Sequence, residues 1–469
     1  MRDLAFIAFL AALLGFGFRR PFLFVLAYVY IDIVSPQRLT YLLLNSVPIS
    51  LIAVGLSVGG WLLFDDKRDT RIAPRQLLLV ILLIYCGITT LTADFPVDAF
   101  GKWEWVWKAL AFAIFLPLTL RTKLRIESLL LFMVLSAASI IIVGGIKTVF
   151  SGGGYGSLNL MVTNNSGLYE GSIISTVAIA IIPLILWFSK YGTIFPPDWK
   201  VKAFCYALAF ACLLIPVGTS ARTGLICIGL LGVMMWRDSK RKLLFVVLAG
   251  VLGLTAVPFL PSSVTDRWST IKTYKSDESA STRLAVWQWT WDYAKQHPLG
   301  GGFEMYRQNR IRYDTEKVAG SGSNIAIERS LVVDKARAFH SAYFEMLGEQ
   351  GYPGLLLWLL INVIGVVRME ILRQIYRKAE AEEAWVAPLA SSLQMAHVVY
   401  LFGAAFVGIA FQPFVYMLIG AQIGLDTYLA RRRSEAAWRP LRKVRRTVTA
   451  PVLTESTMPN SPPRSSASP

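Results

Sequence analysis

The sequence predicts an all-α polytopic membrane protein with about 12 to 13 transmembrane helices and one long loop on the outward side. Of its 469 residues, 55% are hydrophobic and only 16% are charged, which is too apolar for a soluble protein of several domains. Apolar runs of about 16 to 25 residues recur along the chain, and each can cross roughly 30 Å of hydrocarbon as a helix. Most of the basic residues cluster between these runs.

The apolar runs predict the order of the spans. The first two are short and separated only by Arg19 and Arg20, so they form either a re-entrant pair or one broken element. We expect spans at residues 3–18, 21–36, 46–64, 76–94, 105–120, 127–148, 169–190, 201–219, 222–236, 243–261, 341–367, 386–410 and 411–429. Four regions follow: an N-terminal transmembrane bundle (1–261), a long outward loop with an interfacial helix (262–340), C-terminal transmembrane helices (341–430), and a basic, then disordered cytoplasmic tail (431–469).

The formal charge of +17 is explained by membrane topology rather than by nucleic-acid binding. Lys and Arg cluster in alternate connections, which the positive-inside rule places in the cytoplasm. We therefore expect no nucleic-acid partner, and membrane lipids are the expected surroundings. The clusters are "DDKRDTRIAPR" (65–75), "RTKLR" (121–125), "RDSKRK" (237–242), "RMEILRQIYRK" (368–378) and "RRRSEAAWRPLRKVRR" (431–446).

Few polar side chains fall deep inside the predicted spans. His397 is the clearest, and we expect it to be hydrogen-bonded to a neighbouring helix rather than to form a proton pathway. The cysteines are expected to be small core residues without disulfide or metal roles. These are Cys86, Cys205, Cys212 and Cys227.

The stretch "PVGTSARTGLICIGLLGVMMW" (216–236) predicts an outward polar turn between two spans. Thr219 and Ser220 are natural N-cap residues, which places Arg222 in the first turn of the next helix. Free backbone N–H groups, the positive end of the helix dipole and a guanidinium together suit a phosphate. The alternative is an interfacial arginine that reaches toward lipid headgroups.

The stretch "SASTRLAVWQWTWDYAKQHPLGGGFEMY" (279–306) predicts a helix in the long outward loop. Ser281 is the expected cap, and Leu284, Trp287 and Trp291 repeat at helical spacing, which suits a helix in the membrane interface. Arg283 is then expected in another first turn. The alternative is an amphipathic packing helix with an ordinary surface arginine.

The stretch "FHSAYFEMLGEQGYPGLLLWLL" (339–360) places His340 where water gives way to lipid. Gly348 and Gly351 fall near the face of His340 and are expected to permit close helix packing beneath it. Glu345 and Glu349 are expected on the opposite side, which leaves no obvious group to orient the histidine.

Two arginines and a histidine at one depth suit one type of reaction. Arg222 and Arg283 can hold a diphosphate leaving group while His340 activates an acceptor hydroxyl. Metal is not expected, because there is no HExxH motif or Cys cluster, and no cofactor is expected either. Ser220, Arg337 and Glu349 are candidates for supporting roles.

The segments "GTSARTG", "STRLAVWQWTWDYAKQHPLGGGF" and "FHSAYFEMLGEQGYPGLLLWLL" resemble, in order and spacing, the O-antigen ligase and polymerase superfamily. "RRPFLFVLAYVYIDIVSPQRLTY" (19–41) is more narrowly similar to putative O-glycosylation ligases associated with exosortase systems. Where family members usually have His-Asn this chain has His340-Ser341, and where they have Ser-Arg-Gly it has Ala221-Arg222-Thr223.

The resemblance implies a bacterial inner-membrane glycosyltransferase of the all-helical, lipid-linked-sugar class, with its active site facing the periplasm. The implied donor is an undecaprenyl-diphosphate-linked glycan, and the acceptor is a glycan, lipid or protein hydroxyl. Arg222 and Arg283 match the arginines taken to bind the donor diphosphate, and His340 matches the histidine taken to activate the acceptor.

Three alternatives stay open on the sequence. A repeat-unit polymerase of the same superfamily would use the same residues. A transporter or flippase of lipid-linked glycans would need polar residues through the depth of the bundle. A non-catalytic assembly factor would give Arg222, Arg283 and His340 no reason to converge.

Overall fold

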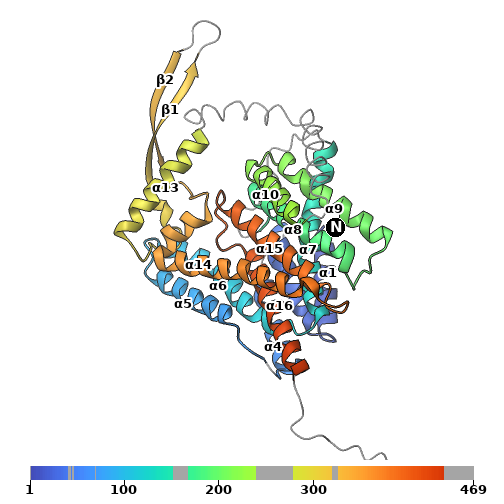
Figure 1. Cartoon of the computed structure of the whole chain (residues 1–469). Helices are drawn as coiled ribbons and strands as arrows, with labels where there is room; N and C mark the ends of the chain where they lie inside the picture. Colours follow the sequence, from blue (N-terminus) through green and yellow to red (C-terminus); the bar gives the residue numbers. More distant parts are fainter. Residues whose placement is uncertain are drawn as a thin grey trace, which may run out of the picture.

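The computed structural model describes residues 2–40, 44, 47–68, 70–150, 167–238, 278–319 and 326–437. Within these residues the chain is a helical bundle with one extended hairpin, as Figure 1 shows. The α-helices are α1 (Arg2–Gly17), α2 (Phe22–Val34), α3 (Pro36–Leu39), α4 (Ile49–Phe64), α5 (Pro74–Leu91), α6 (Pro96–Thr119), α7 (Lys123–Phe150), α8 (Gly171–Tyr191), α9 (Trp199–Gly218), α10 (Arg222–Asp238), α13 (Glu278–Gln296), α14 (Ala342–Ile375), α15 (Val386–Ala404) and α16 (Pro413–Ala437).

The predicted fold class is confirmed: the protein is an all-α polytopic membrane protein. Helices occupy every expected span except 243–261, which lies outside the described residues. Six described helices are long and apolar enough to cross a membrane, namely α5, α7, α8, α9, α14 with its continuation, and α15. Helices α1, α2 and α4 are apolar but shorter. The first two spans are separate helices joined by a tight turn at residues 18–21.

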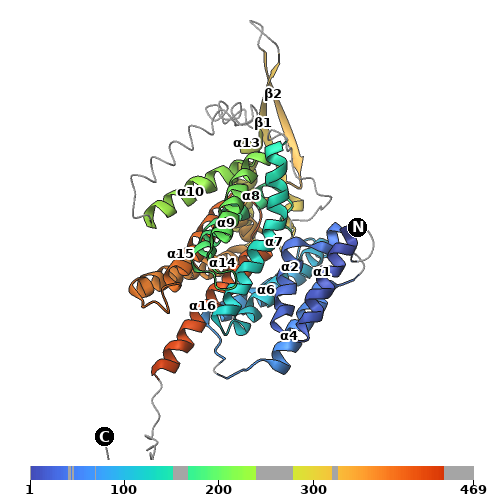
Figure 2. The same cartoon turned by 90° about the vertical axis from the view of Figure 1, so that its right-hand side faces the viewer.

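Helix α8 forms the centre of the bundle. In its most apolar window, 83% of the residues are buried by the protein itself. It packs against α7, α9, α10 and α15, and Figure 2 shows it flanked by α7, α9 and α10. Because its side chains face protein on nearly all sides, α8 is hydrophobic all round rather than amphipathic.

The outward loop contains a hairpin that the sequence analysis did not anticipate. Strands β1 (Arg310–Ala319) and β2 (Ala326–Lys335) pair antiparallel, with Arg310 opposite Lys335 and Ala319 opposite Ala326. Figure 1 shows the hairpin projecting beyond α13. Its base shares a small apolar core with α13 and the 3₁₀ helix η3 (Met305–Gln308), formed by Val286, Tyr293, Met305, Ile311 and Phe339.

Helix α14 is broken at Gly351, whose φ of 63° and ψ of −167° are not helical. In a regular helix the Glu349 carbonyl would accept from residue 353, which is a proline without an N–H. The loop after α13 supplies the missing donors: Gly301 N–H donates to Gly348 O at 3.0 Å, and Gly302 N–H to Glu349 O at 2.9 Å. The loop therefore completes the helix at its break.

The glycines in this loop allow the close approach. A Cβ on Gly300, which has a φ of 87°, would lie 2.5 Å from the Glu349 carbonyl oxygen, and one on Gly351 would lie 2.3 Å from the Pro298 oxygen. The expectation that Gly348 and Gly351 admit a neighbouring helix is therefore wrong. Gly348 admits the ring of Phe339, and Gly351 admits the loop backbone.

Polar side chains reach deeper into the bundle than the sequence analysis expected. His397 Nε2 lies 2.8 Å from Asn362 Oδ1, and its Nδ1 lies 3.1 Å from Gln422 Nε2. Gln422 in turn accepts a 2.6 Å hydrogen bond from Arg75. The expected bond from His397 to a neighbouring helix is thus confirmed. The four cysteines are also buried, as expected.

The basic connections gather in two places. Arg125 pairs with Asp65 at 2.6 Å, and Arg431 donates to the Leu120 carbonyl at 3.1 Å. Figure 1 shows the connection between α4 and α5 and the end of α16 at the opposite end of the molecule from the hairpin. This grouping agrees with a common side for these basic clusters.

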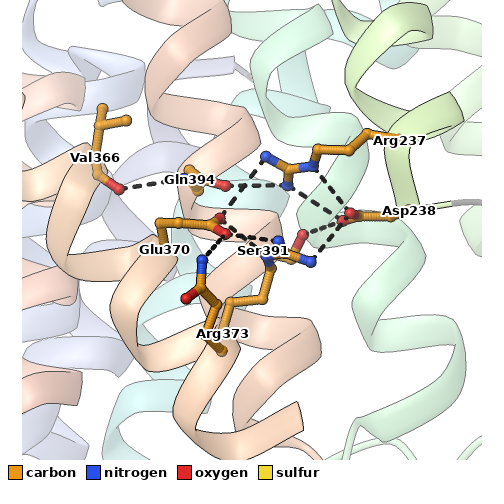
Figure 3. Close-up of polar contacts among 8 residues, drawn as sticks. Arg237, Asp238, Val366, Glu370, Arg373, Ser391 and Gln394 are labelled. Atoms are coloured by element: carbon orange, nitrogen blue, oxygen red, sulfur yellow. Dashed lines mark hydrogen bonds and ion pairs between the residues drawn. The ribbon is translucent and has the colours of Figure 1, made fainter.

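The second group joins the ends of α10 and α14 to the start of α15. Arg373 lies 2.6 Å from Glu370 and 3.4 Å from Asp238. Figure 3 shows how Arg237 and Gln394 extend this network, with Arg237 donating to Gln394 at 3.0 Å. The network holds together the ends of helices that the sequence places in the cytoplasm.

Candidate functional site

A pocket of about 230 Å³ lies where α13, α14 and the start of α8 meet. It contains two of the predicted site residues, Arg283 and His340, together with the supporting candidate Glu349. It also contains Lys102, Glu170 and Glu304, which the sequence analysis did not single out. Segments far apart in the chain therefore bring cations, carboxylates and a histidine to one cavity.

Helix α13 positions Arg283 through an aromatic contact one turn later. The Trp287 ring stacks on Phe344 with centroids 5.0 Å apart and planes 7° apart, and its Nε1 donates to the Phe339 carbonyl at 2.8 Å. Residues four apart share a face of a helix, so docking Trp287 on the segment around His340 brings Arg283 to the same place. Leu284 and Trp291 stay exposed, as an interfacial helix requires.

The start of α13 differs from the expectation. The helix begins at Glu278, so Ser281 lies inside it rather than at its cap, and Arg283 is in the second turn. Ser281 was a reasonable cap because serine favours that position. The upstream polar residues extend the helix by less than one further turn. Arg283 consequently reaches the pocket as a side chain on a helix face, without a helix N-terminus behind it.

His340 is held in a strained backbone conformation. Its φ is 48°, and that of nearby Ala336 is 56°. Non-glycine residues in this region cost of order 1–3 kcal/mol and persist only where the surroundings enforce them. Buried Asn309 holds the segment between Ala336 and His340 in place. Its side-chain amide donates to Arg337 O at 2.7 Å, and its side-chain oxygen accepts from Arg337 N–H at 2.9 Å.

The surroundings of His340 favour its neutral form. Desolvation by the pocket walls lowers its pKa from the usual 6.5, and the nearby Arg283 and Arg337 lower it further. Glu170 acts in the opposite direction. Its carboxylate caps α8 by accepting from Ile173 N–H at 2.8 Å. Glu170 is thus the acidic neighbour that the sequence analysis could not find, and Arg337 influences His340 through its charge.

Lys102 and two glutamates form a buried ionic cluster in the wall of the pocket. Lys102 Nζ donates to Glu345 at 2.7 Å and to both oxygens of Glu349 at 2.8 Å. The side chains of Lys102, Glu345 and Glu349 are only 10%, 8% and 0% exposed. Both glutamates line the pocket that contains His340. Their hydrogen bonds go to Lys102 and to backbone amides, which agrees with the expectation that neither is the partner of the histidine.

The same cluster fixes the surrounding backbone. Glu345 Oε2 accepts from Ala410 N–H at 3.0 Å, and Glu349 Oε1 accepts from Glu304 N–H at 3.0 Å. The loop between α15 and α16 is thereby held against the pocket, although the sequence analysis read residues 405–410 as helix. Because Lys102 precedes the expected span 105–120, it could not be recognised from the sequence as a buried lysine, which is the signal for such a cluster.

Arg222 is the first residue of α10, which confirms its expected first-turn position. Its side chain is exposed and does not line the pocket of His340. The preceding turn packs beside that pocket, since the Thr219 hydroxyl lies 2.9 Å from that of Ser175 and Thr219 contacts Gly171 at the start of α8. The structure therefore brings Arg283 and His340 together and leaves Arg222 at the neighbouring helix start.

The capping assignment for Thr219 and Ser220 is wrong. Thr219 ends α9, and its hydroxyl donates to the Ile215 carbonyl at 2.8 Å. Ser220 has a φ of 50° and is separated from the helix by Ala221. A left-handed residue allows the chain to reverse within a three-residue turn, which competes with the capping geometry.

Within the described part of the chain, no group of three or more His, Cys, Asp or Glu side chains is arranged to hold a metal ion. The carboxylates of Glu345 and Glu349 are both bonded to Lys102. A reaction without a metal or cofactor remains a prediction.

Two family models match separate parts of the chain. Residues 1–193 match a family of unknown function (DUF5935), and residues 207–359 match the family described as O-Antigen ligase. A comparison with curated proteins gives no match. The second region contains Arg222, Arg283 and His340, and the likeness to the exosortase-associated branch stays a prediction. Residues 207–359 are therefore similar to the family described as O-Antigen ligase, and this similarity supports a place in the O-antigen ligase superfamily and a ligase- or polymerase-type function in a multi-pass membrane protein.

Proposed function

We propose that the protein is an O-antigen ligase-like glycosyltransferase that moves a glycan from an undecaprenyl-diphosphate donor to an acceptor hydroxyl at the periplasmic face. The observation that carries this proposal is the convergence of Arg283 and His340 in one pocket. They come from a loop helix and from a position just before a membrane helix, which supports a pocket at the membrane boundary, where a lipid-anchored diphosphate would meet the aqueous side.

The reaction is a single displacement at the anomeric carbon. The acceptor oxygen forms a bond to that carbon while the bond from carbon to phosphate oxygen breaks. His340 takes the acceptor's proton, and the lipid diphosphate leaves with the electron pair of the broken bond. The lowered pKa of His340 keeps the ring neutral near pH 7, as a general base requires.

The arginines stabilise the charge that develops on the leaving group. Arg283 acts inside the pocket, and Arg222 acts from the adjacent start of α10, where backbone N–H groups add to its charge. Planar guanidinium groups suit phosphate oxygens because they donate two parallel hydrogen bonds. Ser220 supports Arg222 only through the turn that it forms.

A transporter or flippase of lipid-linked glycans is the alternative from another class. A transporter would need polar residues within the bundle, and a hydrogen-bonded series of buried side chains meets this expectation. The series is Arg75, Gln422, His397 and Asn362. These groups are hydrogen-bonded to one another, which is the arrangement of a structural network. A repeat-unit polymerase would carry out the same displacement with a second lipid-diphosphate-linked glycan as the acceptor.

The test is reconstitution of the purified chain in liposomes with lipid-diphosphate glycan and candidate acceptors, followed by mass analysis of the acceptors. His340→Ala should abolish transfer and leave donor binding largely intact, because the arginines still hold the diphosphate. Normal transfer by His340→Ala would remove the base assignment. Lost donor binding in a folded variant would make His340 a donor ligand.

The orientation has its own test. A topology reporter fused at residue 310 should report the periplasm, and one fused after residue 440 should report the cytoplasm. A cytoplasmic signal from residue 310 would refute the proposed function, since the pocket would face the wrong side.

A further inference from the structure

The connection between α4 and α5 and the end of α16 together form a small basic pocket. Figure 1 shows both segments at the end of the molecule opposite the hairpin. The pocket has a volume of about 60 Å³ and shares no lining residue with the pocket of His340. Its lining residues are Arg71, Thr427, Ala430, Arg431, Ser434 and Glu435.

Arg431 is oriented in this pocket by a hydrogen bond to another helix. Its Nη2 donates to the Leu120 carbonyl, at the end of α6, at 3.1 Å. Thr427 and Ser434 lie one turn to either side of Arg431 on α16, so their hydroxyls share its helix face. One face of α16 therefore presents a guanidinium between two hydroxyls.

Arg71 is brought to the same pocket by a connection whose backbone is held on both sides. Before it, Arg121 Nη2 donates to the Arg68 carbonyl at 2.6 Å. After it, the N–H of Ala73 donates to the side chain of Gln76 at 2.8 Å. Arg71 itself is exposed, and no acidic side chain among the described residues forms an ion pair with it. Its guanidinium is thus positioned by the fold without being neutralised.

The lining suits a single phosphate group. Two guanidinium groups, Arg71 and Arg431, outnumber the one carboxylate, Glu435. Guanidinium groups donate parallel hydrogen bonds to phosphate oxygens. The volume of about 60 Å³ equals that of roughly two water molecules in the liquid, so a phosphate group fits, whereas a nucleotide or an oligosaccharide does not.

The surroundings of the pocket are apolar. Ile72 directly follows Arg71 and is 71% exposed, and Leu63 and Phe64 in the last turn of α4 are 76% and 72% exposed. Helix α5, which begins three residues after Arg71, is long and apolar enough to cross a membrane. Residues 413–425 of α16, which precede the pocket, are also mostly apolar. The pocket therefore lies where basic residues meet hydrocarbon, at the depth of lipid headgroups.

We propose that this pocket binds the phosphodiester headgroup of an anionic glycerophospholipid, in the leaflet that the basic clusters predict to be cytoplasmic. Free phosphate offers the same charge, but the exposed apolar residues beside Arg71 would add nothing to its binding. The acyl chains of a lipid can lie along these residues while its phosphate contacts the two arginines. A bound lipid would link the connection before α5 to α16 and, through Arg431, to the end of α6.

The test measures lipid binding to the full-length chain in detergent by native mass spectrometry. Phosphatidylglycerol should remain bound and raise Tm, because a ligand of the folded state stabilises it, whereas phosphatidylcholine at the same concentration should do neither. Arg71→Gln should weaken phosphatidylglycerol binding at least about fivefold, which is about 1 kcal/mol. Arg68→Gln is the matched control, because it removes the same charge from the same connection but does not line the pocket.

Each outcome decides the assignment without reference to the reaction at His340. Equal losses in Arg71→Gln and Arg68→Gln would show that the lipid responds only to total charge, and would overturn the pocket. Equal binding of phosphatidylethanolamine, whose ammonium could pair with Glu435, would overturn the preference for an anionic headgroup. Inorganic phosphate that binds as tightly as phosphatidylglycerol would assign the pocket to a free anion instead. If Arg71→Gln fails to fold, the wild-type comparison still decides, since equal retention of phosphatidylcholine would refute the proposal.

Discussion

Replacing Lys102 by methionine tests the ionic cluster beneath the site. Lys102 makes hydrogen bonds of 2.7, 2.8 and 2.8 Å to Glu345 and Glu349, whose side chains are 8% and 0% exposed. Lys102→Met keeps the length of the side chain but leaves two buried carboxylates without their cation. Removing one partner of such a buried pair costs about 3–5 kcal/mol.

This cost converts into a measurable shift of the unfolding temperature. An unfolding entropy of roughly 2.1 cal/mol/K per residue over 469 residues gives about 1 kcal/mol/K, so Lys102→Met should lower Tm by roughly 3–5 °C. Thermal unfolding of the purified protein, followed by size-exclusion fluorescence, measures this shift. Lys190→Met, at an exposed position in the last turn of α8, is the control and should change stability by no more than about 0.5 kcal/mol.

A compensating variant makes the reasoning refutable. Replacing Glu345 and Glu349 by glutamine in the Lys102→Met background removes the unpaired charges and should recover much of the lost Tm. An unchanged Tm in Lys102→Met, or a further fall in the triple variant, would show that charge compensation does not hold this region together.

Three further predictions concern the site and its support. Arg222→Lys and Arg283→Lys should each reduce transfer roughly tenfold or more at normal protein abundance, because lysine cannot donate two parallel bonds to phosphate; near-normal turnover in both would favour arginines that contact only lipid headgroups. The acidic limb of the rate profile should lie below pH 6.5, because desolvation lowers the pKa of His340 from that value. Activity is then lost only as the pH falls through the lowered pKa. The contribution of His340 to folding stability is present above its unfolded pKa and is lost over the same fall in pH. An acidic limb at or above pH 6.5 in single-turnover assays would contradict this prediction. Gly351→Ala should lower the free energy of unfolding by at least about 1–3 kcal/mol, because the φ of Gly351 is 63° and the added Cβ would lie 2.3 Å from the Pro298 oxygen. The control is Gly229→Ala, which has open space around it and should unfold at the wild-type temperature or slightly above it.

The helices were predictable because hydropathy is a local property. Each apolar run must satisfy its own backbone within the membrane, so the runs mark the helices without knowledge of their neighbours. The first-turn position of Arg222 and the helix that carries Trp287 and Trp291 also follow from local patterns. Span ends were less predictable, as the helical start of α6 before Lys102 shows.

The site was only partly predictable because its remaining partners meet through tertiary packing. Lys102 and Glu349 belong to helices far apart in the chain, and no spacing rule within either helix indicates their contact. Glu170 could be placed beside His340 only once the tertiary fold brought the start of α8 and the segment before α14 to one pocket. Strand β1 alternates polar and apolar residues only over Arg310–Asp314 and β2 does not alternate, so the signal for the hairpin is much weaker than that of a span.

The glycine loop that completes α14 also determines how slowly its own backbone amides exchange hydrogen with solvent. Amides in an exposed loop normally exchange with deuterium within seconds, because local opening costs almost nothing. The amides of Gly301 and Gly302 donate to carbonyls of a membrane helix, so each can exchange only when the loop leaves the helix. Their protection should therefore report the free energy of detaching the loop from α14, and hydrogen exchange at these two residues follows directly the contact that completes the segment carrying His340.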